Sequence, residues 1–469
     1  MKSYDIVIIG GGTAGCAAAY IAGKLGLKVL IIEQNSHLGG TMTSGLVVPV
    51  MKSGENQINT DFYNDLINAM SNAGGQITFQ GNPGWFNPQI LKIILEKMLT
   101  EVGVDIIYNS CVADINMKSR QIESLNIIYN SRIYSSACTC TSTSNFSYKG
   151  VLDENKNYKI LSVYDDTLCT DNTKKYNSIK YKILSVPINS KYYIDATGNS
   201  EICKKCNCEF LDEKNITQPV SLRFVMSGVD VDQFGSWLLE YDDNREVSPV
   251  VNIGGITHLS TAYTWDTDKH WALAPLFDKA VEENVLKDSD RNYFQVFTIP
   301  GMPGSVAFNC PRIMLDNNEL SFESASKALE EGHRAILRIS KFCNIYLKGF
   351  KNAYISDIAD MLGVRVSNRI RGRYVLTKDD ILSGRKFKNP VVISNYPIDV
   401  HSGNKNQSKL EKVSDYQIPL ECLASADIDN LFVVGRSLSA EFEAQAAARV
   451  QASCFSMGEG LVKYLANNL

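Results

Sequence analysis

The chain opens on alternating blocks of apolar and small residues. The β-branched run from Ile6 to Ile9 predicts a short buried strand of a parallel sheet. The alanine-rich segment at 14–25 predicts a helix, and Val29 to Ile32 predict a second strand. Strand, helix and strand in this order are typical of a βαβ unit.

The pattern changes period several times further along the chain. It predicts helices at 59–74, 88–102 and 322–345, and strands at 104–108, within 116–190 and at 217–229. The last part reads as a buried strand, a glycine turn and one long helix, which resembles the first βα unit. The chain therefore leaves its first domain and returns to it.

These elements predict an α/β fold with two main domains. We expect a Rossmann-like nucleotide-binding domain with a parallel sheet that is discontinuous in sequence, and an inserted α+β substrate domain. The expected boundaries are 1–130, 185–210 and 425–469 for the nucleotide domain, 131–184 for a β-rich elaboration, and 211–424 for the substrate-binding cap.

A glycine motif lies between the first strand and the first helix. Gly10, Gly12 and Gly15 fit the pattern G-x-G-x-x-G, in which the glycines allow a tight turn, close approach of a phosphate, and close helix packing. The helix amides then face a diphosphate. Glu33 ends the second strand, where a carboxylate can accept hydrogen bonds from ribose hydroxyls. The alternative is a glycine-rich turn that binds nothing.

The residues after Glu33 favour FAD over NAD. Gly39 and Gly40 follow soon after the acid and suit a loop that passes close to a large flavin nucleotide. The cofactor motif also starts at residue 4, with no substrate domain before it.

Composition excludes several classes of function. The 469 residues carry a formal net charge of −4, which predicts no broad attraction to nucleic acid or to an anionic membrane. No apolar run is long enough for a membrane span, and no export signal begins the chain. We therefore expect a cytoplasmic protein whose cysteines are reduced.

Four blocks of sequence carry a resemblance to a known family. They are "DIVIIGGGTAGCAAAYIAGKLGLKVLIIEQNSHLGGTMTSGLV", "YYIDATGNSEI" with "TQPVSLRF", "GVRVSNRIRGRYVLTKDDILSGRKF" with "NYPIDVHS", and "NLFVVGRSLSAEFEAQAAARVQASCFSMGEG". Together they span nearly the whole chain. The sequence resembles the FAD-dependent oxidoreductases, a broad bacterial group of glutathione-reductase-like two-domain flavoproteins.

The resemblance implies FAD as the cofactor and a set of residues around it. The turn at Ala196, Thr197 and Gly198 would pass beside the dinucleotide, and the terminal strand and helix would lie against the flavin end. The implied cofactor-binding residues are Gly10, Gly12, Thr13, Ala14, Gly15, Glu33, Gln34, Gly39, Gly40, Thr41, Thr43, Val112, Ala196, Thr197, Gly198, Gly435, Arg436 and Ala444.

The third block supplies candidate substrate-binding arginines. Arg365 and Arg369 align with a family run, and a guanidinium binds a carboxylate through two hydrogen bonds, which favours an anionic substrate. If the run is extended, Arg369, Arg371 and Arg373 share one face. The alternative is that these arginines pair with Asp379, Asp380 or the FAD phosphates.

Proton transfer has two further candidates in the block "NYPIDVHS". Tyr396 and His401 lie there, and the ordinary pKa of a histidine suits proton transfer near neutral pH. His401 has a structural alternative, a hydrogen bond that holds a loop. On the terminal helix, Arg449 is a candidate to face inward.

The cysteines leave the question of a metal open. Cys203, Cys206 and Cys208 form C-x-x-C-x-C, and Cys138 with Cys140 forms C-x-C. Together they could supply thiolates for zinc or an iron–sulfur cluster. A complete metal site normally shows two well-separated pairs of ligands with flanking turn residues, so we expect plain thiols rather than a metal site or a disulfide.

The expected activity is hydride or electron exchange between FAD and a small organic metabolite. No Cys-x4-Cys pair follows the first βαβ unit and no second G-x-G-x-x-G exists, which argues against a disulfide reductase. The sequence leaves open whether the electron partner is a diffusible NAD(P)H, a quinone or a protein. It also leaves open whether the protein forms an oligomer. The alternatives are a flavin monooxygenase or halogenase, and a flavin electron carrier without its own substrate.

Overall fold

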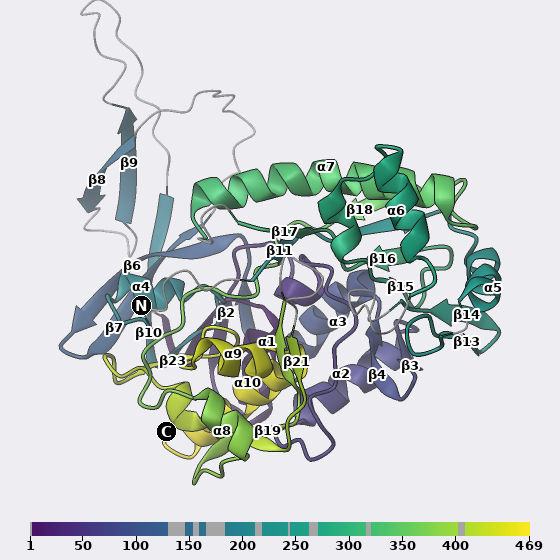
Figure 1. Cartoon of the computed structure of the whole chain (residues 1–469). Helices are drawn as coiled ribbons and strands as arrows, with labels where there is room; N and C mark the ends of the chain where they lie inside the picture. Colours follow the sequence, from purple (N-terminus) through teal and green to yellow (C-terminus); the bar gives the residue numbers. More distant parts are fainter. Residues whose placement is uncertain are drawn as a thin grey trace, which may run out of the picture.

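The chain is built around a nine-stranded sheet (Figure 1). The computed structural model describes residues 2–129, 146–152, 159–165, 183–211, 218–242, 244–261, 271–315, 320–401 and 409–469. Five strands of this sheet are parallel, in the order β5 (Asp105–Ile107), β2 (Val29–Ile32), β1 (Lys2–Ile9), β10 (Ile183–Asp195) and β23 (Leu431–Val433). Strands from both ends of the chain therefore lie in one sheet.

The register brings the functional turns to one edge. Ile9 lies opposite both Ile32 and Asp195, and Asp195 lies opposite Val433. The carboxyl ends of these parallel strands are thus level, which is the edge where open α/β sheets bind ligands.

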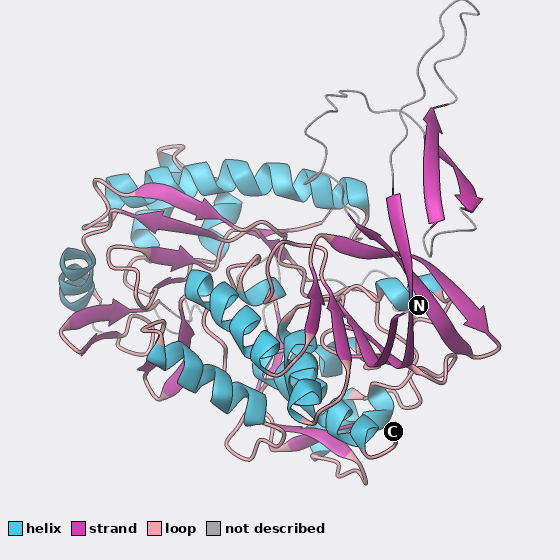
Figure 2. Ribbon diagram, turned by 180° about the vertical axis from the view of Figure 1, so that it is seen from behind, coloured by secondary structure: helices cyan, strands magenta, loops and turns pink. Residues whose placement is uncertain are grey.

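Side chains of β1 alternate between two cores. Ile6 and Ile8 face a core that also holds residues of α1 (Thr13–Lys24) and α10 (Gln451–Ala466). A Cβ at Gly458 would lie 2.3 Å from the carbonyl oxygen of Ala14, so glycine at this position lets α10 approach α1 closely. The helices α2 (Asp61–Asn72) and α3 (Pro88–Glu101) pack on the same side, as Figure 2 shows from behind.

The opposite face of the sheet is covered by a second core. It contains Val7 and Ile9 of β1 together with residues of β6 (Ser110–Lys118), β7 (Gln121–Tyr129) and α4 (Glu201–Lys205). The first half of β10 pairs antiparallel with β7 and with β9 (Lys159–Asp165), which in turn pairs with β8 (Phe146–Leu152).

A smaller antiparallel sheet forms the second part of the molecule. Its order is β15 (Val296–Thr298), β16 (Val306–Phe308), β12 (Phe224–Ser227) and β18 (Tyr354–Ile358). The long helix α7 (Phe322–Tyr346) runs along the top in Figure 1. Phe342 of α7 packs on Phe277 of α6 (Ala274–Glu282), and this cluster extends through Phe294 to Phe308 of the sheet.

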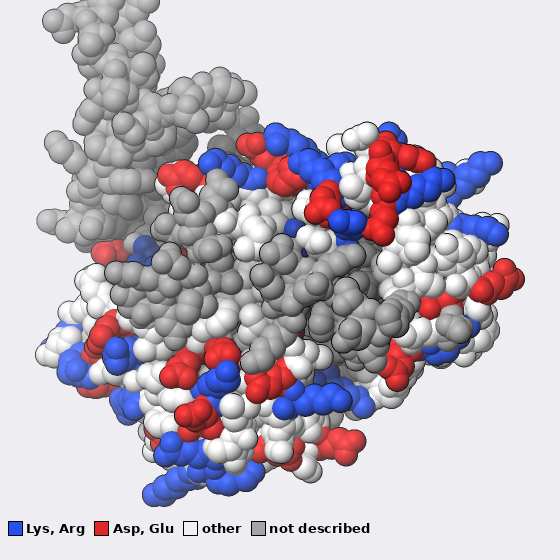
Figure 3. Space-filling view, viewed as in Figure 1, with Lys and Arg blue, Asp and Glu red and all other residues white. Residues whose placement is uncertain are grey.

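Short elements complete the described fold. They are β3 (Gln76–Phe79), β4 (Asn82–Phe86), β11 (Val220–Ser221), α5 (Val231–Tyr241), β13 (Val250–Ile253), β14 (Ile256–Leu259), β17 (Arg312–Ile313), α8 (Lys378–Ser383), β19 (Pro390–Ser394), β20 (Ile398–Val400), β21 (Lys409–Glu411), β22 (Tyr416–Pro419) and α9 (Phe442–Ala448). Figure 3 shows positive and negative side chains interspersed over the described part of one face.

Two expectations from the sequence are wrong in detail. The predicted terminal helix is broken, because α9 ends at Ala448 and α10 begins at Gln451, with Val450 in an extended conformation between them. The single strand expected at 217–229 is two strands, β11 and β12, and Arg223 lies between them. The helix α8 is capped by Thr377, whose hydroxyl accepts a hydrogen bond from the Asp380 amide at 3.1 Å.

Within the described residues, no helix is both long enough and apolar enough to cross a bilayer.

Candidate active site

A cavity of about 260 Å³ lies at the carboxyl edge of the parallel strands and extends toward the second sheet. Ten of the residues expected to bind the cofactor line it: Gly12, Thr13, Ala14, Gly40, Thr41, Ala196, Thr197, Gly198, Gly435 and Arg436. The polar residues that line its other end are Arg223, Asn309, Arg365, Tyr396, His401, Arg449 and Gln451. One cavity thus joins the glycine motif to the second sheet.

The glycine loop is shaped by close backbone contacts. A Cβ at Gly10, where φ is +103°, would lie 2.5 Å from the carbonyl oxygen of Ala196. A Cβ at Gly15 would lie 2.0 Å from the carbonyl oxygen of Gly10. At Gly12, by contrast, a Cβ would meet no atom within 4 Å, because this residue borders the open cavity.

The amino end of α1 has no cap of its own. Gly12 occupies the N-cap position without a side-chain hydrogen bond, and the first turn contains no acidic residue. The first amides of a helix have no intrahelical partner and carry positive partial charge. Uncapped amides beside an open cavity fit a bound diphosphate.

Glu33 at the end of β2 is only 4% exposed. Its Oε2 accepts a hydrogen bond from the Gly11 amide at 2.6 Å, and its Oε1 accepts from the Asn35 amide at 2.8 Å. Burial raises the pKa of Glu33, and these hydrogen bonds act in the opposite direction. In this structure the carboxylate therefore holds the glycine loop, and its contact with a ribose stays a prediction.

Arg436 connects the two chain segments that border the cavity. Its Nε donates to the carbonyl oxygen of Gly198 at 2.7 Å, and its terminal nitrogen donates to Oδ1 of Asn199 at 2.7 Å. Burial lowers the pKa of Arg436 to about 10, so the guanidinium stays charged at neutral pH.

The other residues expected at the cofactor do not line this cavity. Gly10 and Gly39 lie in turns with positive φ, Gly15 lies in the first turn of α1, and Glu33 and Gln34 follow β2. The Thr43 hydroxyl donates to the carbonyl oxygen of Leu38 at 2.6 Å, and Val112 and Ala444 are core residues. Their contact with a cofactor stays a prediction.

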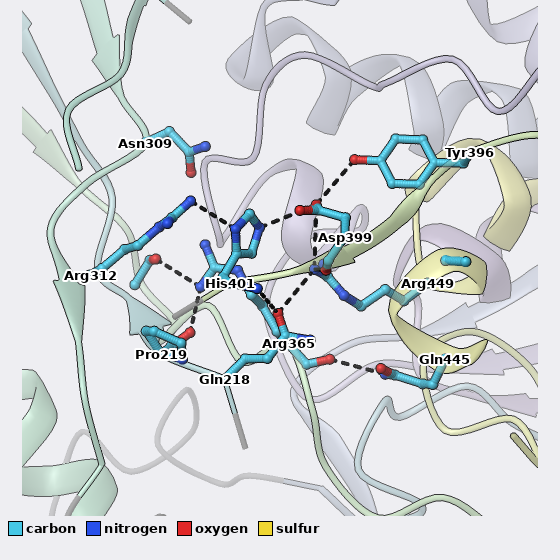
Figure 4. A network of polar contacts seen from close by, with 12 residues as sticks. Gln218, Pro219, Asn309, Arg312, Arg365, Tyr396, Asp399, His401, Gln445 and Arg449 are labelled. Carbon is cyan, nitrogen blue, oxygen red and sulfur yellow. Dashed lines mark hydrogen bonds and ion pairs between the residues drawn. The ribbon is translucent and has the colours of Figure 1, made fainter. Parts of the chain in front are cut away.

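His401 is the centre of a polar network at the other end of the cavity (Figure 4). Its Nδ1 lies 2.9 Å from a terminal nitrogen of Arg312, and its Nε2 lies 3.3 Å from Oδ2 of Asp399. Because an arginine can only donate, Nδ1 is the acceptor and the proton sits on Nε2. Burial and the nearby Arg312 and Arg365 place the pKa of His401 well below its ordinary value. The imidazole is therefore neutral at neutral pH, and a role of His401 in proton transfer stays a prediction.

Asp399 holds several members of this network. Its Oδ2 accepts a hydrogen bond from the Tyr396 hydroxyl at 3.2 Å and lies 3.7 Å from a terminal nitrogen of Arg449. Burial acts to raise the pKa of Asp399, but the hydrogen bond from His401 and the charge of Arg449 hold it below its usual range. Burial also raises the pKa of Tyr396 well above its usual value, so its hydroxyl keeps its proton.

The candidate arginines have different surroundings. Arg365 is 6% exposed, lines the cavity and donates to the Ser221 hydroxyl at 3.1 Å. Arg369 is 4% exposed, does not line the cavity and donates to the carbonyl oxygen of Ala440 at 2.9 Å. Arg371 and Arg373 are half-exposed, with Arg371 paired to a surface glutamate at 2.8 Å. The run therefore does not present one face of arginines to the cavity.

The sequence did not identify several polar residues of this site as candidates. Arg223 donates from Nε to Oδ1 of Asn309 at 2.7 Å, and Arg312 stacks on the ring of Tyr293 with 3.3 Å between the guanidinium carbon and the ring centroid. Asp399 lies in the block "NYPIDVHS", between the candidates Tyr396 and His401. This proximity in sequence could have identified it as a candidate. The inward position of Arg449 was anticipated.

Within the described ranges, no group of three or more histidine, cysteine or acidic side chains has an arrangement that could hold a metal ion. Cys203 and Cys208 are buried thiols, and the Cys206 sulfur lies 3.9 Å from that of Met117. Cys138 and Cys140 lie outside the described residues.

The comparisons with known proteins agree with this architecture. A family model described as FAD dependent oxidoreductase matches residues 5–152 and 148–462, and the chain belongs to this family. FAD is its cofactor, and the uncapped helix and glycine loop described above fit that molecule.

Curated relatives match only a short segment. Dihydrolipoyl dehydrogenase 3 of Pseudomonas putida is 63% identical over 41 residues, which is 9% of each chain. Digeranylgeranylglycerophospholipid reductase 2 of Methanothermobacter thermautotrophicus is 56% identical over 36 residues, 8% of this chain and 9% of the relative.

Among solved structures, the flavin-dependent brominase Bmp2 aligns with a TM-score of 0.44 and 13% identity, covering 100% of this chain and 79% of that one. A geranylgeranyl bacteriochlorophyll reductase-like protein from Thermoplasma acidophilum aligns with a TM-score of 0.41 and 12% identity, covering 100% and 79%.

Replacement of His401 by glutamine is expected to weaken the pH dependence of stability below about pH 6.5. Because the pKa of His401 is lower in the folded state, the unfolded chain binds the proton first as the pH falls. This linkage reduces the free energy of unfolding by up to about 1.4 kcal/mol per pH unit below the unfolded pKa. The measurement is the thermal midpoint of both proteins between pH 5 and 8. If the thermal midpoints of the two proteins change in parallel with pH, the low pKa of His401 in the folded state is contradicted.

Proposed function

We propose that this protein exchanges a hydride, or electrons, between FAD and a small organic anion held at the arginine-rich end of the cavity. The observation that carries the proposal is the continuity of that cavity, which joins the uncapped amino end of α1 to Arg223, Arg365 and Arg449. When bound, FAD supplies the two-electron redox chemistry, and the protein positions the substrate and manages protons.

The chain's own residues divide these tasks. Arg223, Arg365 and Arg449 bind an acidic group of the substrate, because guanidinium groups form charge-assisted hydrogen bonds with carboxylates. Asn309 orients Arg223 through its 2.7 Å hydrogen bond. Arg369 does not line the cavity, and we assign it a positioning role through its hydrogen bond to the carbonyl oxygen of Ala440.

Tyr396 is the better candidate for moving a proton at the substrate. Its hydroxyl is protonated, lines the cavity and is held by Asp399. His401 already donates from Nε2 and accepts at Nδ1, so in this arrangement it orients Arg312 and Asp399 rather than carrying the proton. Either residue acts as a proton donor or acceptor only if it reaches the reacting atom.

The test is the visible spectrum of the purified protein, followed by anaerobic titration with small organic acids. We expect flavin absorption, and loss of the oxidised flavin spectrum when a substrate acid is added. If only NAD(P)H bleaches the flavin, and the acid then stimulates oxygen consumption, the protein is a monooxygenase. If only a protein donor bleaches it, the protein is an electron carrier. A colourless protein that takes up no FAD would contradict the proposal.

A further inference from the structure

Positive charge exceeds negative charge at the substrate end of the cavity. The lining residues include Arg223, Arg365, Arg436 and Arg449 but, among the residues that the structure describes, no aspartate or glutamate. Arg436 is committed to the loop after β10 through Gly198 and Asn199, which places it at the cofactor end.

The other three lining arginines act on one another and on Arg312, which lies next to His401 but does not line the cavity. Burial is the largest cause that lowers the pKa of Arg365, Arg223 and Arg312, and in each of them other arginines of the group, including Arg449, lower it further. The pKa of Arg223 falls to about 10, so its guanidinium is still charged at neutral pH. Among the residues that the structure describes, Asp399 is the carboxylate in contact with this group.

The charge balance therefore favours a ligand with more than one negative charge. In the described part of the site, the guanidinium groups of Arg223, Arg312, Arg365 and Arg449 interact electrostatically with one another, and Asp399 is the carboxylate that contacts this group. A monocarboxylate would leave two of the excess charges buried without a counter-ion, whereas a dicarboxylate would leave one. A buried charge is costly unless it is paired.

Hydrogen-bond donors remain available on these side chains. Arg223, which is 7% exposed, uses its Nε for Asn309, and no described residue accepts from its two terminal nitrogens. The Nε atoms of Arg312 and Arg449 are buried and have no acceptor in the described structure. Room for Arg223 is provided by Gly363, where a Cβ would lie 2.5 Å from a terminal nitrogen of this arginine.

The donors come from opposite sides of the cavity. Arg223 directly precedes β12, and Arg365 lies in the segment that follows β18. Arg449 is the C-cap residue of α9. Figure 4 shows Arg312 and Arg449 reaching toward His401 from opposite sides, with Arg365 close by. Two separated sets of donors match two separated acidic groups better than one.

We propose that the substrate is a dicarboxylate, with one carboxylate bound between Arg223 and Arg365 and the other bound by Arg449. This inference rests on the proposed function, because it names the class of anion that the same cavity holds. It adds that a ligand with a single carboxylate binds weakly.

The experiment uses the FAD-loaded protein and a panel of straight-chain acids. Dicarboxylates of three to six carbons are compared with monocarboxylates of the same length and with a simple phosphate monoester. Binding is followed by the perturbation of the flavin spectrum and by the shift in thermal midpoint. We expect at least one dicarboxylate to bind about tenfold or more tightly than its monocarboxylate. Equal binding of the two, or tighter binding of the phosphate monoester, would overturn the proposal.

Two variants test where the anion binds. Arg223→Gln is expected to lose about tenfold or more in dicarboxylate affinity, yet to keep or raise the thermal midpoint of the ligand-free protein because repulsion among the arginines falls. Gly363→Ala displaces the Arg223 guanidinium and is expected to weaken the dicarboxylate in the same direction. Arg371→Gln, which alters a half-exposed arginine outside the cavity, is the matched control and should bind like the original protein.

Failure of this inference is distinguishable from failure of the proposed function. If the flavin is present and bleached by an organic acid, but dicarboxylates bind no better than monocarboxylates, the proposed function stands and the substrate class is wrong. If dicarboxylates bind with full affinity to Arg223→Gln, the assignment of this arginine is wrong. A protein without flavin contradicts the proposed function itself.

Discussion

Gly15→Ala is expected to yield a protein that binds little or no FAD. The new Cβ would lie 2.0 Å from the carbonyl oxygen of Gly10, a backbone atom that cannot move without shifting the loop or helix α1. Overpacking of a tight site costs about 1–3 kcal/mol, and here the strain falls on the helix amides that would hold a diphosphate. The measurement is the ratio of flavin to protein after purification, together with the thermal midpoint.

Gly12→Ala is the matched control for this prediction. A Cβ at Gly12 meets no protein atom within 4 Å, so the variant should fold with an unchanged thermal midpoint in the absence of FAD. It should nevertheless weaken FAD binding, because the methyl group enters the space next to the helix amides. If Gly15→Ala retains full flavin and an unchanged midpoint, the close packing of α1 on the loop is not important for cofactor binding.

Asp399→Asn is expected to destabilise the protein by about 3–5 kcal/mol, because it leaves Arg312, Arg365 and Arg449 near His401 without their carboxylate. Asparagine has nearly the same shape as aspartate, so loss of charge, and not loss of volume, causes the effect. The measurement is thermal unfolding of the ligand-free variant at neutral pH.

A surface aspartate provides the comparison for this variant. Asp429→Asn removes a half-exposed partner of Arg120 at 3.3 Å and should change the free energy of unfolding by less than about 1 kcal/mol. Equal effects of the two substitutions would show that Asp399 does not counter buried positive charge.

The nucleotide-binding half of the fold was predictable because its signals are local. Gly10, Gly12 and Gly15 stand at fixed spacing between two apolar runs, and the structure places that loop at the carboxyl end of β1. The capping residues of α8, Thr377 and Asp380, are likewise close together in sequence. Signals of this kind depend on neighbours within a few residues.

The arginine-rich end of the cavity was less predictable because it depends on distant contacts. Arg223, Arg312 and Arg449 come from three separate segments, and nothing in the residues around each indicates that Arg312 contacts His401 or that Arg449 contacts Asp399. The low pKa of His401 follows from its burial and from the nearby Arg312 and Arg365, so the sequence around it could not show it. The break between α9 and α10, which places Arg449 at the cavity, contains neither glycine nor proline at 449–450.

The position of β23 in the parallel sheet has a consequence for biosynthesis. This strand pairs with β10, which pairs with β1 as well. The segment after β23 contributes Gly435, Arg436, Arg449 and Gln451 to the cavity wall. A ribosome that has not yet made this final segment has therefore produced the glycine loop but not these residues of the cavity wall. We expect nascent chains to capture FAD only once translation has passed this final segment.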